Sequence, residues 1–292
     1  MTERIAEDGP THQARAFART IKLSHSIFAL PFALAAAALA AVDHGITLWQ
    51  VGWILVAMVS ARSAAMGFNR IVDRDIDGRN PRTATREIPA GELGVATAWG
   101  WTGASAVVFF AASWLLGPLC LLLAPVALAV VWGYSLAKRV TWWCHIILGV
   151  ALGLAPVGAW VAIAGELAVL PVLLAWIVGT WVAGFDIIYS CQDAGFDAEE
   201  GLHSIPARFG LAGALWISLT LHGLTVAGLA VLPFVAELSW IYWLGFAAMA
   251  GTLAYEHWIV GPDDLSRVDK AFFDLNGYVS LAFFGTVLVA LI

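Results

Sequence analysis

The chain has 292 residues, of which 61% are hydrophobic and 12% are charged. This charged fraction is about half that of an average soluble globular protein, so the composition excludes that class. The net charge of −6 says little about partners, because the charged residues are confined to a few segments. Cys120, Cys144 and Cys191 lie in or beside apolar runs without paired spacing, which indicates neither a disulfide framework nor a zinc site.

Apolar runs recur along the whole chain, and about 20 apolar residues in a helix cross the hydrocarbon core of a membrane. We therefore predict an all-α polytopic membrane protein, a bundle of about nine transmembrane helices. Residues 1–22 are expected to form an N-terminal cytoplasmic or interfacial arm, and residues 23–292 a single transmembrane domain. The expected spans are 23–42, 47–69, 95–116, 119–137, 141–162, 168–189, 211–232, 236–258 and 272–292.

Basic residues are distributed very unevenly over the segments between these spans. Fourteen of the 15 fall on one side of the predicted bundle, whereas the loops on the other side contain only acidic charges. The positive-inside rule then places the N-terminus and the loops after the second and sixth spans in the cytoplasm. The remaining basic residue, Arg62, lies inside a span, where a charge costs roughly 2.5–3.5 kcal/mol and should therefore face a polar cavity.

Charge gathers first in NRIVDRDIDGRNPRTATREIPAG, residues 69–91, at the cytoplasmic end of the second span. Asn69, Asp73 and Asp77 are four residues apart, so they share one face of a helix. Arg62 lies seven residues before Asn69 on the same face, deeper in the membrane. A single pair of aspartates at this spacing is weak evidence, because solvated helix ends often carry one.

The same pattern recurs in DIIYSCQDAGFDAEEGLHSIPARFG, residues 186–210, at the cytoplasmic end of the sixth span. Tyr189, Asp193 and Asp197 are again four residues apart, and Asp186 lies seven residues before Asp193. Two copies at equivalent places favour a functional site. They also suggest that the second half is a parallel, diverged repeat of the first.

Carboxylates at this spacing repel each other, and a multivalent cation reverses the sign of that interaction. Mg²⁺ prefers oxygen ligands and typically joins one or two carboxylates to substrate phosphates. Arginines, which follow both motifs, suit phosphate oxygens. We therefore predict a Mg²⁺–diphosphate site at the cytoplasmic face, for a diphosphate whose long apolar tail lies in lipid or in a hydrophobic groove. Mg²⁺ would neutralise the leaving diphosphate, and aromatic faces would stabilise the allylic cation that remains.

The two segments resemble the motifs of the UbiA superfamily of intramembrane aromatic prenyltransferases. That family's motifs are N-x-x-x-D-x-x-x-D and Y-x-x-x-D-x-x-x-D, which the two aspartate segments match. The resemblance covers nearly the whole chain and implies a nine-helix fold, Mg²⁺ dependence and prenyl transfer from a prenyl diphosphate to an acceptor. A further pattern, R-T-x-x-R-x-x-P-x-G, is matched by Arg82, Thr83, Arg86, Pro89 and Gly91.

Roles for individual residues follow from this resemblance and from the chemistry above. Asp186 is a hypothetical base that orients or deprotonates an acceptor hydroxyl, and it joins the motif aspartates as a candidate catalytic residue. Arg62 and Lys22 are candidates for binding the acceptor. The candidate metal ligands are Asn69, Asp73, Asp77, Asp193 and Asp197, and the candidate diphosphate-binding residues are Arg82, Arg86, Lys138, Arg139, Tyr189 and Arg208. His145, His222 and His257 lack ligand spacing and receive no role.

Within the family, IKLSHSIFALPFAL and EGLHSIPARFG resemble the 4-hydroxybenzoate polyprenyltransferase branch, especially its menaquinone relatives of the futalosine route. We expect transfer of a polyprenyl group to a 4-hydroxybenzoate-type aromatic carboxylate in quinone (ubiquinone) biosynthesis. The alternative acceptor is 1,4-dihydroxy-6-naphthoate, for menaquinone. The resemblance implies a multi-pass protein of the cell (inner) membrane, and we expect no nucleic acid and no obligate protein partner.

Two other classes compete with this interpretation. CDP-alcohol phosphatidyltransferases also use aspartate repeats in a helical bundle, but their D-G-x-x-A-R block is absent after Asp77. A membrane transporter would also carry intramembrane charge, although usually near the midplane in broken helices. Here the acidic clusters lie at one face, which suits an enzyme that works on lipid head groups from one side.

Overall fold

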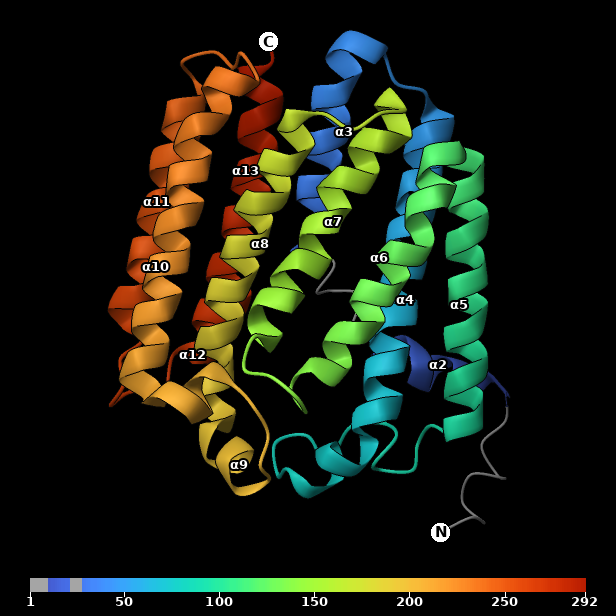
Figure 1. The fold of residues 1–292 in the computed structure, drawn as a ribbon, viewed down its shortest axis with the longest axis vertical. Helices are drawn as coiled ribbons and strands as arrows, with labels where there is room; N and C mark the ends of the chain where they lie inside the picture. The colour runs from blue at the N-terminus through green and yellow to red at the C-terminus, as the bar shows by residue number, and fades with distance from the viewer. Residues whose placement is uncertain (1–9, 22–27) are drawn as a thin grey trace. The chain divides into compact units, whose positions relative to one another are not determined.

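The computed structural model describes residues 10–21 and 28–292, and among these residues all regular elements are helical, apart from one isolated bridge between Gly261 and Asp264 (Figure 1). The predicted all-α membrane class is confirmed, because seven helices in the described ranges are long and apolar enough to cross a membrane. These are α4 (Leu48–Arg79), α5 (Val95–Leu116), α6 (Pro118–Ala137), α7 (Cys144–Ala164), α8 (Val169–Ser190, continued to Glu199), α10 (Ile205–Val235) and Val268–Ala290.

The other two expected spans are also helical. α3 (Leu30–His44) is apolar but has only 15 described residues, and α11 (Tyr242–Ile259) has 18. α11 falls outside the seven because charged and polar groups, including Glu256 and His257, lower the apolarity of its last turns. Within the described residues, which exclude 23–27 of the first expected span, each expected span coincides with a helix, and seven of these helices meet the criterion of length and apolarity.

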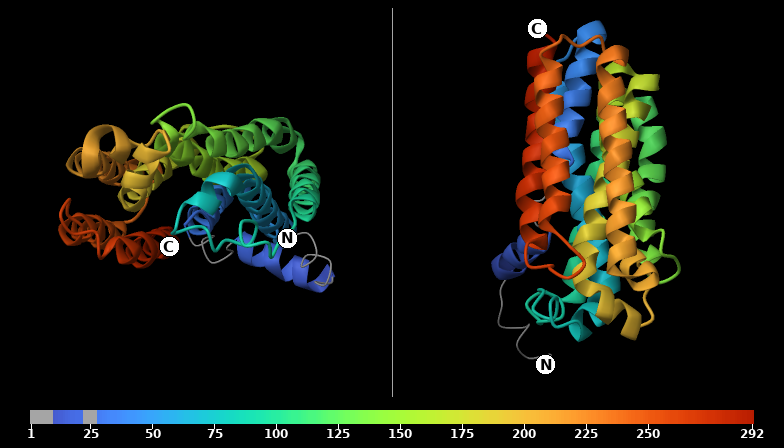
Figure 2. Two further views of the ribbon diagram at one scale, coloured as in Figure 1. Left: turned by 90° about the horizontal axis from the view of Figure 1, so that it is seen from below. Right: turned by 90° about the vertical axis from the view of Figure 1, so that its left-hand side faces the viewer.

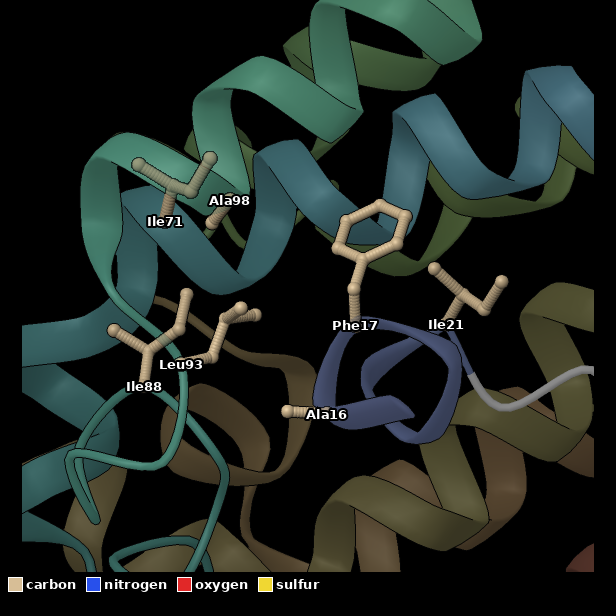
Figure 3. Packing of buried hydrophobic residues seen from close by; sticks show 7 residues of the cluster. All are labelled: Ala16, Phe17, Ile21, Ile71, Ile88, Leu93 and Ala98. Atoms are coloured by element: carbon tan, nitrogen blue, oxygen red, sulfur yellow. The ribbon is translucent and has the colours of Figure 1, made fainter. Parts of the chain in front are cut away.

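The chain forms two compact units, and the first contains α2 (Pro10–Thr20), most of α4, α5 and α6. Within α2, Ala16 and Phe17 are buried, and Figure 3 shows them gathered with Ile21 against apolar residues of α4, α5 and the loop between those helices. The predicted N-terminal arm therefore includes an ordered helix, because one face of α2 covers apolar surface.

Small residues let α5 and α6 approach α4 closely. A Cβ atom at Gly67 would collide with the Thr102 side chain of α5. From α6, the indole Nε1 of Trp132 donates to the Ala64 carbonyl at 3.2 Å, and the ring of Trp132 stacks on Phe68. These contacts fix α4, which carries the first aspartate motif.

The second unit contains α3, α7, α8, α10, α11 and α13 (Asn276–Ala290), together with the short α9 (Ala194–Glu199) and α12 (Val268–Lys270). Figure 2 shows α10 alongside α8 and α13 alongside α11, and these pairs are in contact. α8 lies at the centre of this unit, with Trp181 and Ile187 fully buried.

Helices α7 and α8 pack through small residues. A Cβ atom at Gly149 would collide with the carbonyl of Gly179, and one at Gly153 would lie 2.7 Å from the carbonyl oxygen of Ala175. Small residues four apart allow the backbones of membrane helices to approach in this way. Because the two helices are antiparallel, this register brings the beginning of α7 against the end of α8.

A buried polar network links α8, α10, α11 and α13. Asn276 accepts from Trp181 Nε1 at 2.6 Å and donates to Glu256 Oε1 at 3.0 Å. His222 Nδ1 lies 2.9 Å from His257 Nε2, and its Nε2 lies 3.2 Å from the Trp181 carbonyl oxygen. In a hydrocarbon environment each of these polar groups needs such a partner, so the network specifies how the four helices fit together.

Candidate functional site

The first motif lies on one continuous helix, as predicted, because α4 extends to Arg79. Asn69, Asp73 and Asp77 therefore share a face at its end. The amide Nδ2 of Asn69 donates to Asp73 Oδ2 at 2.9 Å, and Arg70 Nη1 donates to Asn69 Oδ1 at 3.3 Å. The asparagine orients the first aspartate of the motif.

The second aspartate of this motif, Asp77, is buried, with 5% of its surface exposed. Its Oδ1 accepts a hydrogen bond from Arg86 Nη1 at 2.6 Å. Its Oδ2 lies 4.0 Å from Arg70 Nη1 and accepts no hydrogen bond from the described residues. Two guanidinium groups therefore lie beside one buried carboxylate.

The loop after α4 folds back onto the end of that helix and so brings Arg86 to Asp77. The backbone N–H groups of Thr83 and Ala84 both donate to the Asn80 carbonyl at 2.9 Å. The hydroxyl of Thr83 donates to the Asp77 carbonyl at 3.0 Å. The R-T-x-x-R pattern thus has a structural meaning, because its threonine and its second arginine both bond to Asp77. Arg82, the first arginine, is exposed.

The loop is also attached to α2. Arg19 Nη2 lies 2.6 Å from Glu92 Oε2, and Gln13 accepts from the backbone N–H of Gly94 at 3.2 Å. Arg62 is half-buried and lies two turns before Asn69 on α4, one of the helices long and apolar enough to cross a membrane. Lys22 is outside the described residues.

The second motif does not lie on one continuous α-helix. α8 ends at Ser190, a 3₁₀ turn follows at Cys191–Asp193, and α9 begins at Ala194. A 3₁₀ turn has about three residues per turn, so it rotates the later side chains relative to Tyr189. Both aspartates of the motif are nevertheless buried, with exposed fractions of 8% for Asp193 and 0% for Asp197.

Lys138 is the basic partner of the second motif. Its Nζ lies 2.7 Å from Asp197 Oδ1, and its carbonyl accepts from the His203 backbone N–H at 2.7 Å. Asp197 Oδ2 is buried and accepts no hydrogen bond from the described residues. Lys138 therefore connects the segment before α7 with α9 through Asp197, and with the loop that follows α9 through His203.

The remaining candidates in the second unit have different surroundings. The ring of Tyr189 stacks on Phe272 with centroids 4.1 Å apart. Arg139 and Arg208 are exposed, and the guanidinium of Arg208 lies over the ring of Trp142, 5.6 Å from its centroid. Asp186, by contrast, is paired with a histidine: its Oδ2 lies 2.7 Å from His145 Nδ1.

His145 is a functional candidate that the sequence did not reveal. It stands 41 residues before Asp186, and no local spacing connects the two residues. The only signal in the sequence is a histidine at the beginning of an otherwise apolar helix. The polar side chains of the α8–α10–α11–α13 network carry the same kind of signal, because polar groups inside membrane helices are rare.

The described residues contain no group of three or more His, Cys, Asp or Glu side chains that could hold a metal ion by themselves. This fits a metal that is bound together with its substrate, since Mg²⁺ usually takes one or two carboxylates and completes its coordination with phosphate and water. The buried Oδ2 atoms of Asp77 and Asp197 supply carboxylate oxygens that have no hydrogen-bond donor of their own. The donor set of each motif thus suits Mg²⁺.

Fold and site together define a polytopic helical membrane protein with two acidic motifs, each neutralised by basic side chains. The model of the UbiA prenyltransferase family matches residues 29–284, so the chain belongs to that family. The resemblance inferred from the motifs is thereby confirmed.

Solved structures agree with this assignment. The apo structure of a UbiA homolog from Aeropyrum pernix K1 is 35% identical, with a TM-score of 0.83 over 92% of this chain and 98% of that chain. A UbiA homolog from Archaeoglobus fulgidus bound to GPP and Mg²⁺ is 18% identical, with a TM-score of 0.74 over 94% of this chain and 99% of that chain. The second likeness shows the shared fold.

Three curated relatives are all named as 4-hydroxybenzoate prenyltransferases. The mitochondrial 4-hydroxybenzoate polyprenyltransferase of Arabidopsis thaliana is 32% identical over 78% of this chain, and that of Aedes aegypti is 30% identical over 82%. The chain spans 56% and 55% of the lengths of these two proteins. The 4-hydroxybenzoate octaprenyltransferase of Tolumonas auensis is 29% identical, with 78% of this chain and 79% of the relative covered.

Proposed function

We propose that the chain catalyses Mg²⁺-dependent transfer of a polyprenyl group from polyprenyl diphosphate to an aromatic carboxylate acceptor of the 4-hydroxybenzoate type. The observation that carries this proposal is the pairing of a buried aspartate with a basic side chain in each motif: Asp77 with Arg86, and Asp197 with Lys138. The names of the curated relatives and the GPP and Mg²⁺ bound by the Archaeoglobus homolog support it.

The charges of these pairs explain how a metal–diphosphate complex could be accepted without leaving a buried charge unpaired. A buried aspartate that lost its arginine or lysine would be costly, because an uncompensated charge remains. A metal–diphosphate complex supplies both missing partners, since the cation meets the carboxylates and the phosphate oxygens meet the basic groups. Arg86 and Lys138 would then exchange a carboxylate for a phosphate, and the number of paired charges would be conserved.

The chain's own residues have distinct tasks in this reaction. The motif residues Asn69, Asp73, Asp77, Asp193 and Asp197 would hold Mg²⁺, which when bound neutralises the departing diphosphate. Arg86 and Lys138 would bind the diphosphate oxygens, and the exposed Arg82, Arg139 and Arg208 would add to the attraction for the diphosphate. Asp186 would take the proton of the acceptor hydroxyl and so increase the electron density of the ring.

The acceptor is proposed to carry a carboxylate, and Arg62 is the candidate to bind it. A guanidinium inside a membrane helix is costly unless it meets an anion or a polar cavity. The relatives' names favour 4-hydroxybenzoate. The alternative acceptor, 1,4-dihydroxy-6-naphthoate, also carries a carboxylate and a hydroxyl group, so the same residues would serve it.

We also propose that the N-terminus and both aspartate motifs face the cytoplasm, in the inner membrane of a cell. Within the second unit, Lys138, Arg208 and Lys270 lie at the helix ends that carry the second motif, whereas Glu166 and Glu237 lie in the loops at the opposite ends. This is the distribution that the positive-inside rule describes. The test introduces Glu166→Cys or Gly201→Cys into a chain whose three native cysteines have been replaced, and treats intact cells with an impermeant thiol reagent. We expect the reagent to label the cysteine at position 166 but not the one at position 201.

The proposed function is tested by an assay in native membranes with a labelled long-chain prenyl diphosphate and Mg²⁺. 4-Hydroxybenzoate and 1,4-dihydroxy-6-naphthoate are offered in parallel, and membranes with the Asp193→Ala variant serve as the control. A prenylated product from one acceptor alone identifies both the reaction and the acceptor. No product from either acceptor, with the protein folded and in the membrane, contradicts the proposed acceptor class.

A further inference from the structure

His145 and Asp186 form a pair whose hydrogen bonds define the protonation of the histidine. The imidazole Nδ1 lies 2.7 Å from Asp186 Oδ2, and Nε2 lies 3.3 Å from the backbone nitrogen of Ile205. A backbone N–H group can only donate, so Nε2 is the acceptor in that contact. The proton of the neutral ring is therefore on Nδ1, which donates it to the carboxylate of Asp186.

The two side chains differ in their accessibility. The His145 side chain is 4% exposed, whereas that of Asp186 is 24% exposed. A substrate can therefore approach the carboxylate but not the imidazole. Both ring nitrogens of His145 are occupied by protein groups, so its contribution to a reaction has to pass through Asp186.

The position of His145 is fixed from three directions. The close approach at Gly149 sets the register of α7 against α8 and so places His145 opposite Asp186. The Ile205 N–H is part of the first turn of α10, which Ser204 caps by accepting from the Ala207 N–H at 3.3 Å. The neighbouring Cys144 also donates to the His203 carbonyl at 3.4 Å. The loop after the second motif thus holds the imidazole in one tautomer.

We infer that His145 is the positioning residue for Asp186: it orients the carboxylate by donating a hydrogen bond to one oxygen, and it leaves the second carboxylate oxygen for an acceptor hydroxyl. This inference rests on the proposed function, because it requires an acceptor with an ionisable hydroxyl on an aromatic ring. It adds to that function a residue that the motifs do not contain.

The proposed step is the alkylation of a phenol ring, in which protons and electrons balance. Asp186 takes the hydroxyl proton, and the electron density moved into the ring forms the new carbon–carbon bond to the prenyl carbon. The bond between that carbon and the diphosphate oxygen breaks, and diphosphate leaves with its electron pair. The ring then loses the hydrogen of the substituted carbon to water as a proton, and the hydroxyl oxygen regains its proton from Asp186.

The test compares variants of the full chain in membranes: Asp186→Asn, His145→Phe and His145→Gln, with Thr180→Val as the control. Thr180→Val removes a buried hydrogen bond of α8, at 2.8 Å to Thr225, but none with His145 or Asp186. Asp186→Asn should lower kcat by about 100-fold or more, the usual size of a general-base contribution. His145→Phe should lower kcat by about 10- to 100-fold, as expected when a supporting hydrogen bond is lost.

Two readouts separate positioning from general damage. His145→Gln should have most of the wild-type kcat, since its amide can donate to Asp186 and accept from Ile205. The KM for prenyl diphosphate should stay unchanged in all variants. A ring-fluorinated 4-hydroxybenzoate, whose hydroxyl is more acidic, should reduce the kcat deficits of Asp186→Asn and His145→Phe relative to the wild type. A purely structural defect would be the same with both acceptors.

Each outcome has a definite meaning. If the wild type makes no prenylated product from a phenolic acceptor, the proposed function fails and the inference fails with it. If the wild type is active but His145→Phe keeps its full kcat, or shows an equal deficit with both acceptors, the inference is overturned and the proposed function stands. Should His145→Phe not fold, His145→Gln and His145→Leu decide. Equal activities in those two variants would contradict the inference, because only the amide can donate to Asp186.

Discussion

Arg86 Nη1 lies 2.6 Å from Asp77 Oδ1, although the two residues are separated by the turn that ends α4. The aspartate belongs to the first motif and the arginine to the loop pattern that follows it. Their contact shows that the two sequence patterns form one structural feature, in which the loop supplies the counter-ion of a motif carboxylate. In the proposed function, the metal–diphosphate complex would replace each half of this pair.

Substitution of Arg86 should affect substrate binding and stability in different ways. Arg86→Gln should raise the KM for prenyl diphosphate by about tenfold or more and destabilise the protein by about 1–3 kcal/mol, because a charged hydrogen bond to a buried carboxylate is lost. Thr85→Ala, in the same loop but at an exposed position, should change stability by less than about 0.5 kcal/mol. Kinetics in membranes and thermal unfolding in detergent measure the two effects.

A double variant distinguishes the structural part of this effect from the functional part. In the single variant Arg86→Gln, Asp77 loses its hydrogen-bonded arginine and keeps only the 4.0 Å contact with Arg70. Adding Asp77→Asn removes this weakly compensated carboxylate, so part of the stability should return. Activity should stay lost, because neither the metal nor the diphosphate has its partner. Recovery of activity together with stability would contradict a direct role of either residue in binding the substrate.

Removal of the metal should silence the enzyme reversibly. EDTA should abolish prenyl transfer in membranes and Mg²⁺ should restore it, because the motif carboxylates alone cannot stabilise a leaving diphosphate. Asp73→Ala and Asp193→Ala should be inactive at every Mg²⁺ concentration, with an unfolding temperature close to that of the wild type. Full turnover in the presence of chelator, or in either variant, would contradict the proposal that these aspartates hold Mg²⁺.

The positions of the helices and the first motif were predictable, because they depend on local patterns. Apolar length marks a span, and residues four apart on a continuous helix share a face, as Asn69, Asp73 and Asp77 do on α4. The second motif has the same spacing, but a 3₁₀ turn at Cys191–Asp193 interrupts its helix. Nothing in the local sequence indicates this turn, whose conformation depends on the packing around it.

Contacts between residues far apart in the chain could not be predicted from the sequence. His145 and Asp186 are joined by the register of two antiparallel helices, and that register depends on the contact at Gly149. The glycines at 149 and 153 do have the four-residue spacing typical of close helix packing, so this signal was available in retrospect. It indicates that α7 packs closely on a neighbour but does not identify the neighbour or the side chains that meet.

The glycine contact between α7 and α8 gives a prediction for stability. Gly149→Ala should lower the free energy of unfolding by about 1–3 kcal/mol, because the added methyl group meets the backbone carbonyl of Gly179, which cannot move aside. Gly158→Ala is the matched control on the same helix, since a Cβ atom there would meet nothing within 4 Å beyond its own stretch of helix backbone. That variant should be neutral or slightly more stable, as alanine favours helix by about 1 kcal/mol. Equal unfolding temperatures for both variants would contradict the close packing.

The buried network around Asn276 should matter for stability rather than for the reaction. Asn276 accepts from Trp181 and donates to Glu256, so Asn276→Ala leaves two fully buried polar partners without a hydrogen bond. We expect a loss of about 1–3 kcal/mol for each group that becomes unsatisfied, with an unchanged KM for prenyl diphosphate in the protein that remains folded. Ser190→Ala, a buried position on α8 whose hydroxyl donates to its own helix at Ile187, should cost much less. Thermal unfolding in detergent compares the two variants. An Asn276→Ala protein as stable as Ser190→Ala would show that the network does not hold α8, α11 and α13 together.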